Sequence, residues 1–297
     1  MGPDIALMRS RGSDRLGANK VFLFMNARDE PSVPEWVAHH VLLGFTHIYI
    51  FDHKSKIPLS RLGTFGGKVT IIPKNLPDGS DVKMPLMETA LHMARAGGAA
   101  WMVYLDADEY MCLNHRPTVQ SFLANYAHAD AVSVNWLMFG TSHHVYQPDG
   151  LIMTNFTHSD RTLDLHVKTF VRPQMVRSSI NPHFYVMLRP NNLYHMCGAK
   201  MPHMGPKFKS PAPTYAHARA YIAHYMVQSE AEFRRRKGRP MDDGTGDKTG
   251  IYAHVHRHHN EVHNTCVSDK YARGILDFLA KRTGPRPRSG GTAQAQK

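Results

Sequence analysis

Residues 102–110 read MVYLDADEY, an apolar and aromatic run that ends in three acidic residues within four positions. Carboxylates are costly to place at the end of a buried strand unless something positive lies among them. The stretch therefore predicts a buried strand followed by a site in which Asp106, Asp108 and Glu109 face a metal ion, a partner lysine or only water.

The chain before this stretch alternates between strand and helix patterns, as in an α/β protein. Apolar runs predict three further strands, which are VFLFMN (21–26), HIYIFD (47–52) and KVTIIP (68–73). Apolar residues at helical spacing predict helices from about Val33 to Gly44 and over roughly 82–96. Ser32 and Glu35 match a capping box for the first helix. WMVYLDADEY (101–110) is then the fourth strand.

Polar residues follow three of these four strands. They are Asn26, Arg28, Asp29 and Glu30 after the first strand, Asp52 and His53 after the second, and Asp106, Asp108 and Glu109 after the fourth. Strand-helix-strand units form parallel sheets, and ligands bind beyond the carboxyl ends of their strands. The sequence therefore brings carboxylates from three strands to one edge. A D-x-D spacing there suits Mg²⁺ or Mn²⁺, which would neutralise a diphosphate leaving group.

The second half of the chain is basic and less regular. AVSVNWLMFGTSHH (131–144) predicts a strand that ends in a loop, HVKTFVRP (166–173) has strand character, and 221–238 reads as a turn or short strand before a basic helix. Residues 165–229 contain no Asp or Glu, which suits a surface that faces phosphates or an acidic acceptor. Within this segment Lys168 is the best phosphate candidate, because it lies in an apolar run.

The overall composition is that of a globular protein, with 297 residues, 42% hydrophobic and 20% charged residues and a net charge of +12. Three widely spaced cysteines indicate a reducing compartment. With no signal peptide or membrane-spanning run in the sequence, we expect a cytoplasmic protein. The positive charge also allows peripheral contact with an acidic membrane surface.

Two basic or histidine-rich motifs have weaker interpretations. HVHRHHNEVH (254–263) has irregular spacing for a zinc site. RRRKGR (234–239) lacks interleaved aromatic residues, which favours a solvated or acid-binding face over a nucleic-acid patch. We therefore expect no nucleic-acid partner.

The chain resembles glycosyltransferases of the GT-A fold, and more narrowly the family 92 / glycosyltransferase-2-like group. The motifs that carry this resemblance are RDEPSVPEWVAHHVLLGFTHIYIFDHKS, WMVYLDADEY, NWLMFGTSHH, VKTFVRP, IAHYMVQSEAEFRRRKGR and HHNEVHNTCVSD. The resemblance implies an α/β fold with a mostly parallel, Rossmann-like sheet flanked by helices and an irregular C-terminal portion. It also implies a nucleotide-sugar donor, usually a UDP-sugar, a glycan or other hydroxyl acceptor, and Mn²⁺ or Mg²⁺.

The same resemblance implies roles for individual residues. The metal would be held by Asp106, Asp108 and His224, and the donor nucleotide would lie near Arg28, Asp29, Glu30, Asp52 and Asp106. With these we group Asn26 and Lys168. The donor sugar and the acceptor would meet a loop with Trp136, Gly140, Thr141 and Ser142, and we add His183. The chain departs from the family at Arg28-Asp29-Glu30, Asp52-His53 and FGTSHH, which bears on the identity of donor and acceptor.

The general base of an inverting transferase is normally a carboxylate within reach of the acceptor hydroxyl. The acid-free segment leaves Asp149, Glu230 and Glu232 as candidates, with His183 or His224 as alternatives and Asp149 slightly favoured. We expect an N-terminal extension (1–19), one GT-A domain (20–282, with halves 20–145 and 146–282) and a disordered tail (283–297).

The sequence thus predicts a metal-dependent hexosyl- or pentosyltransferase, with inversion as the family expectation. A nucleotidyltransferase acting on sugar phosphates is the nearest rival, but MNARDEPS has no glycine in the loop after the first strand. A basic nucleic-acid-binding protein is the rival from another class, and it does not explain acids at three strand ends.

Overall fold

The computed structural model describes residues 20–77, 81–181, 183–237 and 259–283. The extension expected over 1–19 and, apart from Thr283, the tail expected over 283–297 lie outside the described residues, as does the first half of HVHRHHNEVH. Within the described ranges, no helix combines the length and apolar character needed to cross a membrane.

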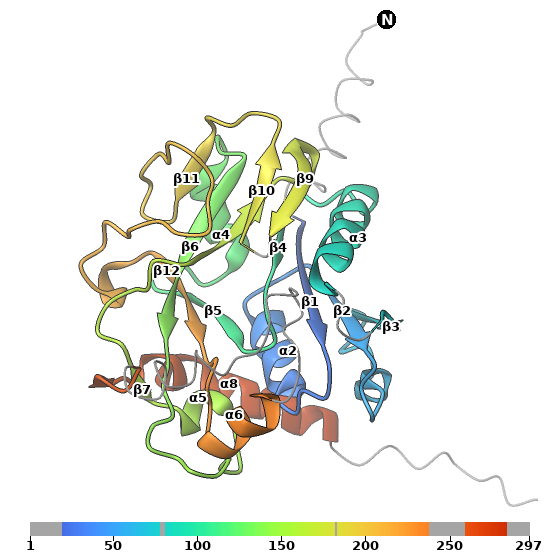
Figure 1. Ribbon diagram of the computed structural model, residues 1–297, viewed down its shortest axis with the longest axis vertical. Helices are drawn as coiled ribbons and strands as arrows, with labels where there is room; N and C mark the ends of the chain where they lie inside the picture. The colour runs from blue at the N-terminus through green and yellow to red at the C-terminus, as the bar shows by residue number, and fades with distance from the viewer. Residues whose placement is uncertain (1–19, 78–80, 182, 238–258, 284–297) are drawn as a thin grey trace, which may run out of the picture.

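A curled nine-stranded sheet forms the centre of the molecule, in the order β3-β2-β1-β4-β8-β6-β12-β5, with β11 beside β6 (Figure 1). Its strands are β1 (Val21–Ala27), β2 (His47–His53), β3 (Val69–Lys74), β4 (Trp101–Tyr104), β5 (Glu109–Leu113), β6 (Ala131–Met138), β8 (Val167–Val171), β11 (Leu193–His195) and β12 (Ala220–His224). Two short two-stranded sheets lie beside it: the hairpin of β9 (Val176–Asn181) and β10 (Phe184–Met187), and the pair of β7 (His158–Ser159) with β13 (Val262–His263).

The strand directions decide where the ends of the strands meet. β1 runs parallel to β2 and β4, and β12 runs parallel to β6. β8 is antiparallel to both β4 and β6, so β6 and β12 point the same way as β4. The carboxyl ends of β1, β2, β4, β6 and β12 therefore lie at one edge, together with the start of β8.

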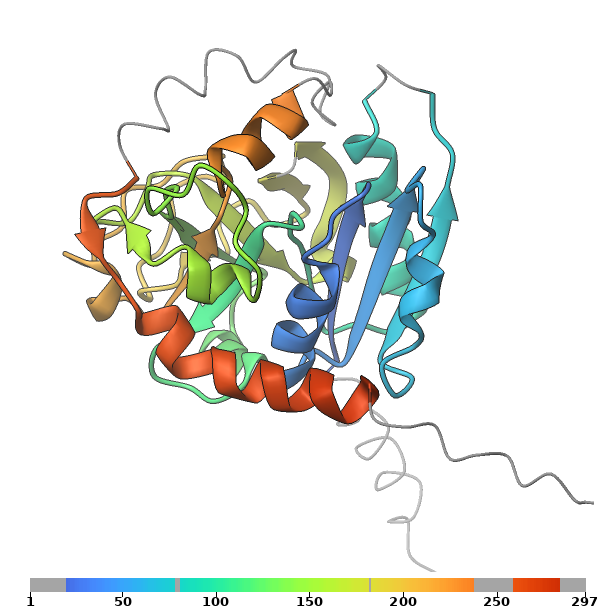
Figure 2. The ribbon, with the colours of Figure 1, turned by 90° about the horizontal axis from the view of Figure 1, so that it is seen from below.

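Helices cover both faces of the sheet, and each face has its own apolar core (Figure 2). α2 (Val33–Leu42) and the long α8 (Cys266–Thr283) pack together on one face, and α3 (Lys83–Ala96) covers the other. The shorter helices are α4 (Val119–Leu123), α5 (Ile152–Asn155) and α6 (Glu230–Lys237), with 3-10 turns η1 (Leu59–Leu62), η2 (Ala124–Tyr126), η3 (Pro173–Met175) and η4 (Tyr215–His217).

The predicted fold class is confirmed: the protein is α/β, with a mostly parallel sheet flanked by helices. The prediction of one strand over WMVYLDADEY is wrong. β4 ends at Tyr104, the chain turns through Asp106 and Asp108, and Glu109 begins β5, which pairs antiparallel with β12. The apolar residues that follow, Tyr110 to Leu113, are buried as well, and this is why the acids lie in a turn between two strands.

The predicted capping box at the start of α2 is also wrong. Ser32 makes no side-chain cap hydrogen bond. Glu35 instead accepts hydrogen bonds from the main-chain N–H groups of Ile152 (2.6 Å) and Met153 (3.2 Å). Its carboxylate therefore caps α5, which follows in the sequence by more than a hundred residues, because α5 packs within reach of α2.

Candidate functional site

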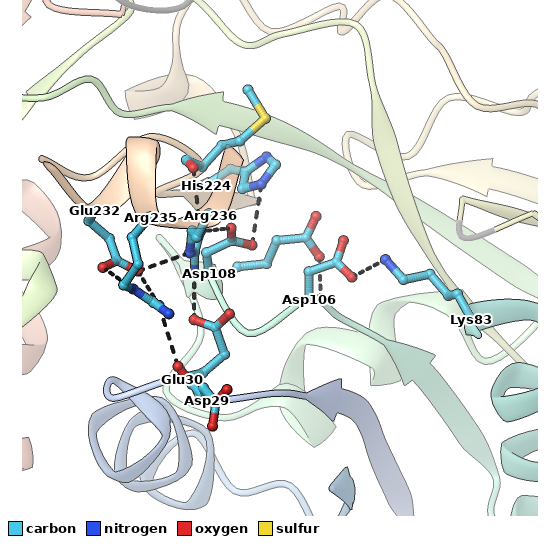
Figure 3. A network of polar contacts seen from close by, with 11 residues as sticks. Asp29, Glu30, Lys83, Asp106, Asp108, His224, Glu232, Arg235 and Arg236 are labelled. Atoms are coloured by element: carbon cyan, nitrogen blue, oxygen red, sulfur yellow. Dashed lines mark hydrogen bonds and ion pairs between the residues drawn. The ribbon is translucent and has the colours of Figure 1, made fainter. Parts of the chain in front are cut away.

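The candidate site lies at the sheet edge where the carboxyl ends of β1, β4 and β12 meet (Figure 3). Glu30 follows β1, Asp106 and Asp108 lie in the turn after β4, and His224 ends β12. The turn is fixed by its own main chain, since Glu109 donates its N–H to the Asp106 carbonyl (3.1 Å) and Tyr225 donates to the Asp108 carbonyl (2.9 Å).

Asp106 is held by two lysines. Its Oδ1 contacts the ammonium of Lys83, at the start of α3, and its Oδ2 accepts a hydrogen bond from Lys168 at 2.9 Å. Burial opposes the charged carboxylate, but Lys168 and Lys83 outweigh it and hold the pKa of Asp106 well below its usual range. Both oxygens of Asp106 are thus engaged by the protein itself.

Lys168 is expected from the sequence to bind phosphate, and in the structure its ammonium contacts two acids of the turn. Its side chain is completely buried, between Asp106 and Glu109, with its Nζ 3.4 Å from Glu109 Oε2. Glu109 also accepts the main-chain N–H of Asp106 (2.8 Å), so its carboxylate fixes the main chain of the turn. Lys168 therefore stabilises the acidic turn from the buried side.

Asp108 faces a histidine and an arginine. Its Oδ1 lies 3.4 Å from His224 Nε2, and its Oδ2 accepts a hydrogen bond from Arg236 at 3.1 Å. Burial alone would raise the pKa of Asp108 and lower that of His224. The mutual attraction of the two groups outweighs burial, so the pKa of Asp108 falls and that of His224 rises.

Arg236 joins the elements around the site. Besides Asp108, its guanidinium contacts Glu30 Oε2 at 2.6 Å and Glu232 Oε1 at 3.2 Å. Arg235 pairs with Glu232 at 2.6 Å and reaches the Asp29 carbonyl at 3.4 Å. The helix α6 is therefore tied to the ends of both β1 and β4 through arginines (Figure 3).

Trp136, near the end of β6, lies close to His224 and Lys168. Its ring is 4.4 Å from that of His224 and 5.2 Å from that of His183, and the Lys168 ammonium lies 6.0 Å from its centroid. Burial, aided by Lys168, lowers the pKa of His183 to about 3, so this imidazole is neutral and a weak base. These contacts bring Trp136 and His183 close to Lys168 and His224, and so to the acidic turn.

His166 adds a further group beside Trp136. Its ring stacks on Trp136 at 5.1 Å, and its Nδ1 pairs with Asp164 Oδ1 at 2.7 Å. About one third of the His166 side chain is exposed, at 34%. An imidazole held on one nitrogen by a carboxylate, with its ring open to solvent, can accept a proton on the other nitrogen.

The residues expected near the nucleotide lie at the ends of β1 and β2, but several have structural partners. Asp52 accepts main-chain N–H groups from Ser55 (3.3 Å) and Leu59 (2.8 Å), and Asp29 accepts from Lys56 (2.7 Å). Asn26 is buried and accepts a hydrogen bond from Tyr104 (3.1 Å), while Arg28 is half-buried. Asp29 and Asp52 therefore shape the loop after β2.

The loop with Gly140, Thr141 and Ser142 packs against the start of the last described segment. Ser142 donates its N–H to Asn260 Oδ1 (2.9 Å), and Asn260 donates to the Thr141 hydroxyl (3.3 Å). A Cβ on Gly140 would lie 2.4 Å from the His259 carbonyl oxygen, so only glycine permits this approach. The loop is closed on this side by residues far away in the sequence.

The two predicted catalytic acids, Asp149 and Glu230, have other partners than the acids of the turn. Asp149 is exposed, and its main-chain carbonyl accepts a hydrogen bond from Asn155 (3.2 Å). Glu230 begins α6 and pairs with Arg234 at 3.3 Å. Their roles as bases stay predictions.

The sequence interpretation missed Lys83, Arg236 and the pair Asp164–His166. RRRKGR was interpreted as a solvated or acid-binding face. Arg236 in this motif is only 7% exposed, and the acids that it binds belong to the protein itself. A signal was present: Glu232 and Arg236 stand four residues apart, so both lie on one side of the helix.

Asp108 and His224 have the right chemistry for a divalent ion. A carboxylate oxygen and an imidazole nitrogen 3.4 Å apart can face one Mn²⁺ or Mg²⁺, whose remaining ligands are commonly phosphate oxygens and water. In the described part of the chain, no three His, Cys, Asp or Glu side chains are grouped so that they could hold a metal. Asp106 fits the role less well, since both its oxygens are engaged by lysines.

No protein-family model matches the chain, and no curated protein matches it. Among solved structures it is similar to HddC from Yersinia pseudotuberculosis, with 12% identity over 73% of this chain and 97% of that chain and a TM-score of 0.35. It is also similar to glucosyl-3-phosphoglycerate synthase from Mycobacterium tuberculosis in complex with Mg²⁺ and UDP, with 11% identity and a TM-score of 0.33. That match covers 59% of this chain and 63% of the synthase. A mycobacterial protein matches with 9% identity and a TM-score of 0.33 over 59% of this chain, which spans 60% of that protein.

Proposed function

We propose that the protein is a metal-dependent glycosyltransferase that moves a hexosyl or pentosyl group from a nucleotide-sugar donor, expected to be a UDP-sugar, to a hydroxyl of a glycan or other acceptor. The observation that carries the proposal is the Asp108–His224 pair, with 3.4 Å between its facing atoms, at the carboxyl edge of a mostly parallel sheet. Ligands of open α/β sheets bind at this edge.

The donor half of the site would be organised around the acidic turn. Asp108 and His224 would hold Mn²⁺ or Mg²⁺, and a bound ion draws negative charge from a leaving diphosphate. Asp106, fixed by Lys83 and Lys168, would face the ribose, and Glu109 would support it from the buried side. The ends of β1 and β2, with Asn26 to Glu30 and Asp52, would border the nucleotide.

The acceptor half would lie over Trp136. The indole ring offers an apolar surface for a sugar, and His183 and the Gly140–Ser142 loop would border it. Asp149 and Glu230 are the general bases that the sequence suggests, and the geometry adds His166, oriented by Asp164 at 2.7 Å. Inversion at the anomeric carbon is the expectation that comes with the resemblance to the GT-A group.

The test is a screen for nucleotide release from UDP-, GDP- and TDP-sugars, with Mn²⁺ or with EDTA. We expect EDTA to abolish release and Asp108→Asn to lower it by at least about 100-fold, because the amide lacks the negative charge that attracts the cation. Asp277→Asn is the matched control, since Asp277 lies on α8 with 61% of its side chain exposed.

A strict need for the acceptor would hide turnover, so nucleotide binding is measured in parallel by calorimetry. Folded wild-type protein that neither releases nor binds any of the three nucleotides with Mn²⁺ present would contradict the proposal. Equal activity of Asp108→Asn and wild type would contradict the assignment of Asp108.

A further inference from the structure

The most unusual feature of the site is the buried guanidinium of Arg236. It contacts three carboxylates from three parts of the chain: Glu30 at 2.6 Å, Asp108 at 3.1 Å and Glu232 at 3.2 Å (Figure 3). Only 7% of its side chain is exposed. The function proposed above gives no role to this residue.

Arg236 contacts Asp108, the carboxylate that would bind the metal in the proposed function. Asp108 is itself only 13% exposed, with one oxygen toward His224 and the other toward Arg236. A guanidinium 3.1 Å from this oxygen neutralises its charge and repels a second cation. Because the pair is nearly buried, water screens this repulsion little. In the protein without ligands, Arg236 therefore opposes metal binding at Asp108.

A nucleotide diphosphate would change this balance. It brings phosphate oxygens to the same edge of the sheet, and a guanidinium binds phosphate through two parallel hydrogen bonds as well as it binds carboxylate. Glu30 and Glu232 would keep Arg236 at the rim of the site when it leaves Asp108. The arginine can thus exchange one anionic partner for another without becoming an unpaired charge.

We propose that Arg236 is a built-in competitor of the divalent metal for Asp108, and that it passes to the diphosphate when the nucleotide binds. The inference rests on the proposed function. Its consequence is a positive coupling between metal and nucleotide: each ligand removes the obstacle that the guanidinium presents to the other, so each raises the affinity for the other.

The neighbouring arginines supply a matched control. Arg234 lies two residues before Arg236 on α6, has 68% of its side chain exposed and pairs with Glu230 at 3.3 Å. Arg234→Gln removes the same charge from the same helix, and differs from Arg236→Gln in leaving the Asp108 contact in place.

The experiment measures free Mn²⁺ by electron paramagnetic resonance during titration of wild type, Arg236→Gln and Arg234→Gln, with and without UDP. For Arg236→Gln we expect Mn²⁺ alone to bind at least about 5-fold tighter than to wild type, and the gain in affinity on adding UDP to shrink by a similar factor. Arg234→Gln should match wild type in both measurements.

Removal of Arg236 leaves Glu30 and Glu232 without this partner, so the fold of the variant is checked by circular dichroism and thermal unfolding. Arg236→Lys serves if the glutamine variant does not fold. It keeps the charge near Asp108, so Mn²⁺ alone should bind within about 2-fold of wild type. Its ammonium lacks the two-pronged grip on phosphate, so the coupling to UDP should fall.

The outcomes separate this inference from the function on which it rests. If wild type binds Mn²⁺ with UDP, and folded Arg236→Gln binds Mn²⁺ alone equally or more weakly, Arg236 does not compete with the metal and only this inference is overturned. An Arg236→Lys protein with unchanged coupling would overturn the transfer to the diphosphate. If folded wild type binds no Mn²⁺ even with UDP, the metal-dependent function falls and this inference with it.

Discussion

The ammonium of Lys168 lies 3.4 Å from the Glu109 carboxylate, and neither side chain exposes any surface to solvent. Lys168 also donates to Asp106, so a single buried cation holds both acids that flank the turn. Burial raises the pKa of Glu109 even with this lysine beside it. The geometry of the acidic turn therefore depends on a charge that the proposed substrates do not touch.

Lys168→Met is expected to lower the free energy of unfolding by about 3–5 kcal/mol, because it leaves the buried Glu109 without its cation and Asp106 with Lys83 alone. Denaturant titration measures the loss. Lys209→Met, at an exposed position of the same acid-free segment, should change stability by less than about 0.5 kcal/mol.

Adding Glu109→Gln to Lys168→Met should restore part of the loss, since the amide carries no charge to bury. A Lys168→Met protein as stable as wild type would show that the acids find other partners.

Glu35 predicts a dependence of stability on pH. Burial raises the pKa of Glu35 from 4.5 to about 7 in the folded protein, and the N–H groups of Ile152 and Met153 offset this only in part. The folded chain therefore holds this proton more tightly than the unfolded chain. Below pH 4.5 both states are protonated, and as pH rises toward 7 the unfolded state loses the proton first.

Stability should thus fall as pH rises from 4.5 to about 7, by up to about 3 kcal/mol from this group, and stay low above it. Chemical denaturation at several pH values measures the slope for wild type and for Glu35→Gln, which cannot ionise. The difference between the two curves isolates Glu35. Parallel curves would mean that the folded protein binds this proton no more tightly than the unfolded chain.

The sequence predicted those parts of the fold that depend on local patterns. Apolar runs placed β1, β2 and β3 within one residue at each end, and helical spacing placed α3. The predicted capping box of Ser32 and Glu35 failed for a physical reason. The Ser-x-x-Glu spacing marks such a box only if no other main chain competes for the glutamate, and here the N–H groups at the start of α5 bind Glu35 instead. Contacts between distant segments have no local signature.

The candidate site was predictable to the same extent. Asp106 and Asp108 were singled out because they follow a buried strand, and His224 through the resemblance to GT-A enzymes. Their partners could not, because Lys83 is separated from Asp106 by 23 residues and Arg236 from Asp108 by 128. Which cation faces which acid is decided by where the start of α3 and the helix α6 lie relative to the turn after β4.

Gly140 tests the packing of the loop beside Trp136. A Cβ there would lie 2.4 Å from both the His259 carbonyl oxygen and Asn260 Oδ1, and a main-chain oxygen cannot rotate away. Gly140→Ala should destabilise the protein by about 1–3 kcal/mol through overpacking, measured by thermal or chemical unfolding.

Gly205→Ala is the control for Gly140→Ala, since its Cβ would find only His203 atoms, at 3.8 Å or more. Equal stability of both variants would show that the last described segment moves freely away from the loop.

We propose His166 as the general base in preference to Asp149 and Glu230, since it stacks on Trp136 at 5.1 Å and is oriented by Asp164. His166→Gln should lower kcat for donor cleavage by about 100-fold with little change in KM for the donor, while Asp149→Asn and Glu230→Gln should each cost less than about 10-fold. Asp164→Asn acts only through the orientation of His166, so we expect a smaller loss and a displaced pH profile. A 100-fold loss in Asp149→Asn, with His166→Gln active, would return the role to the acid that the sequence suggested.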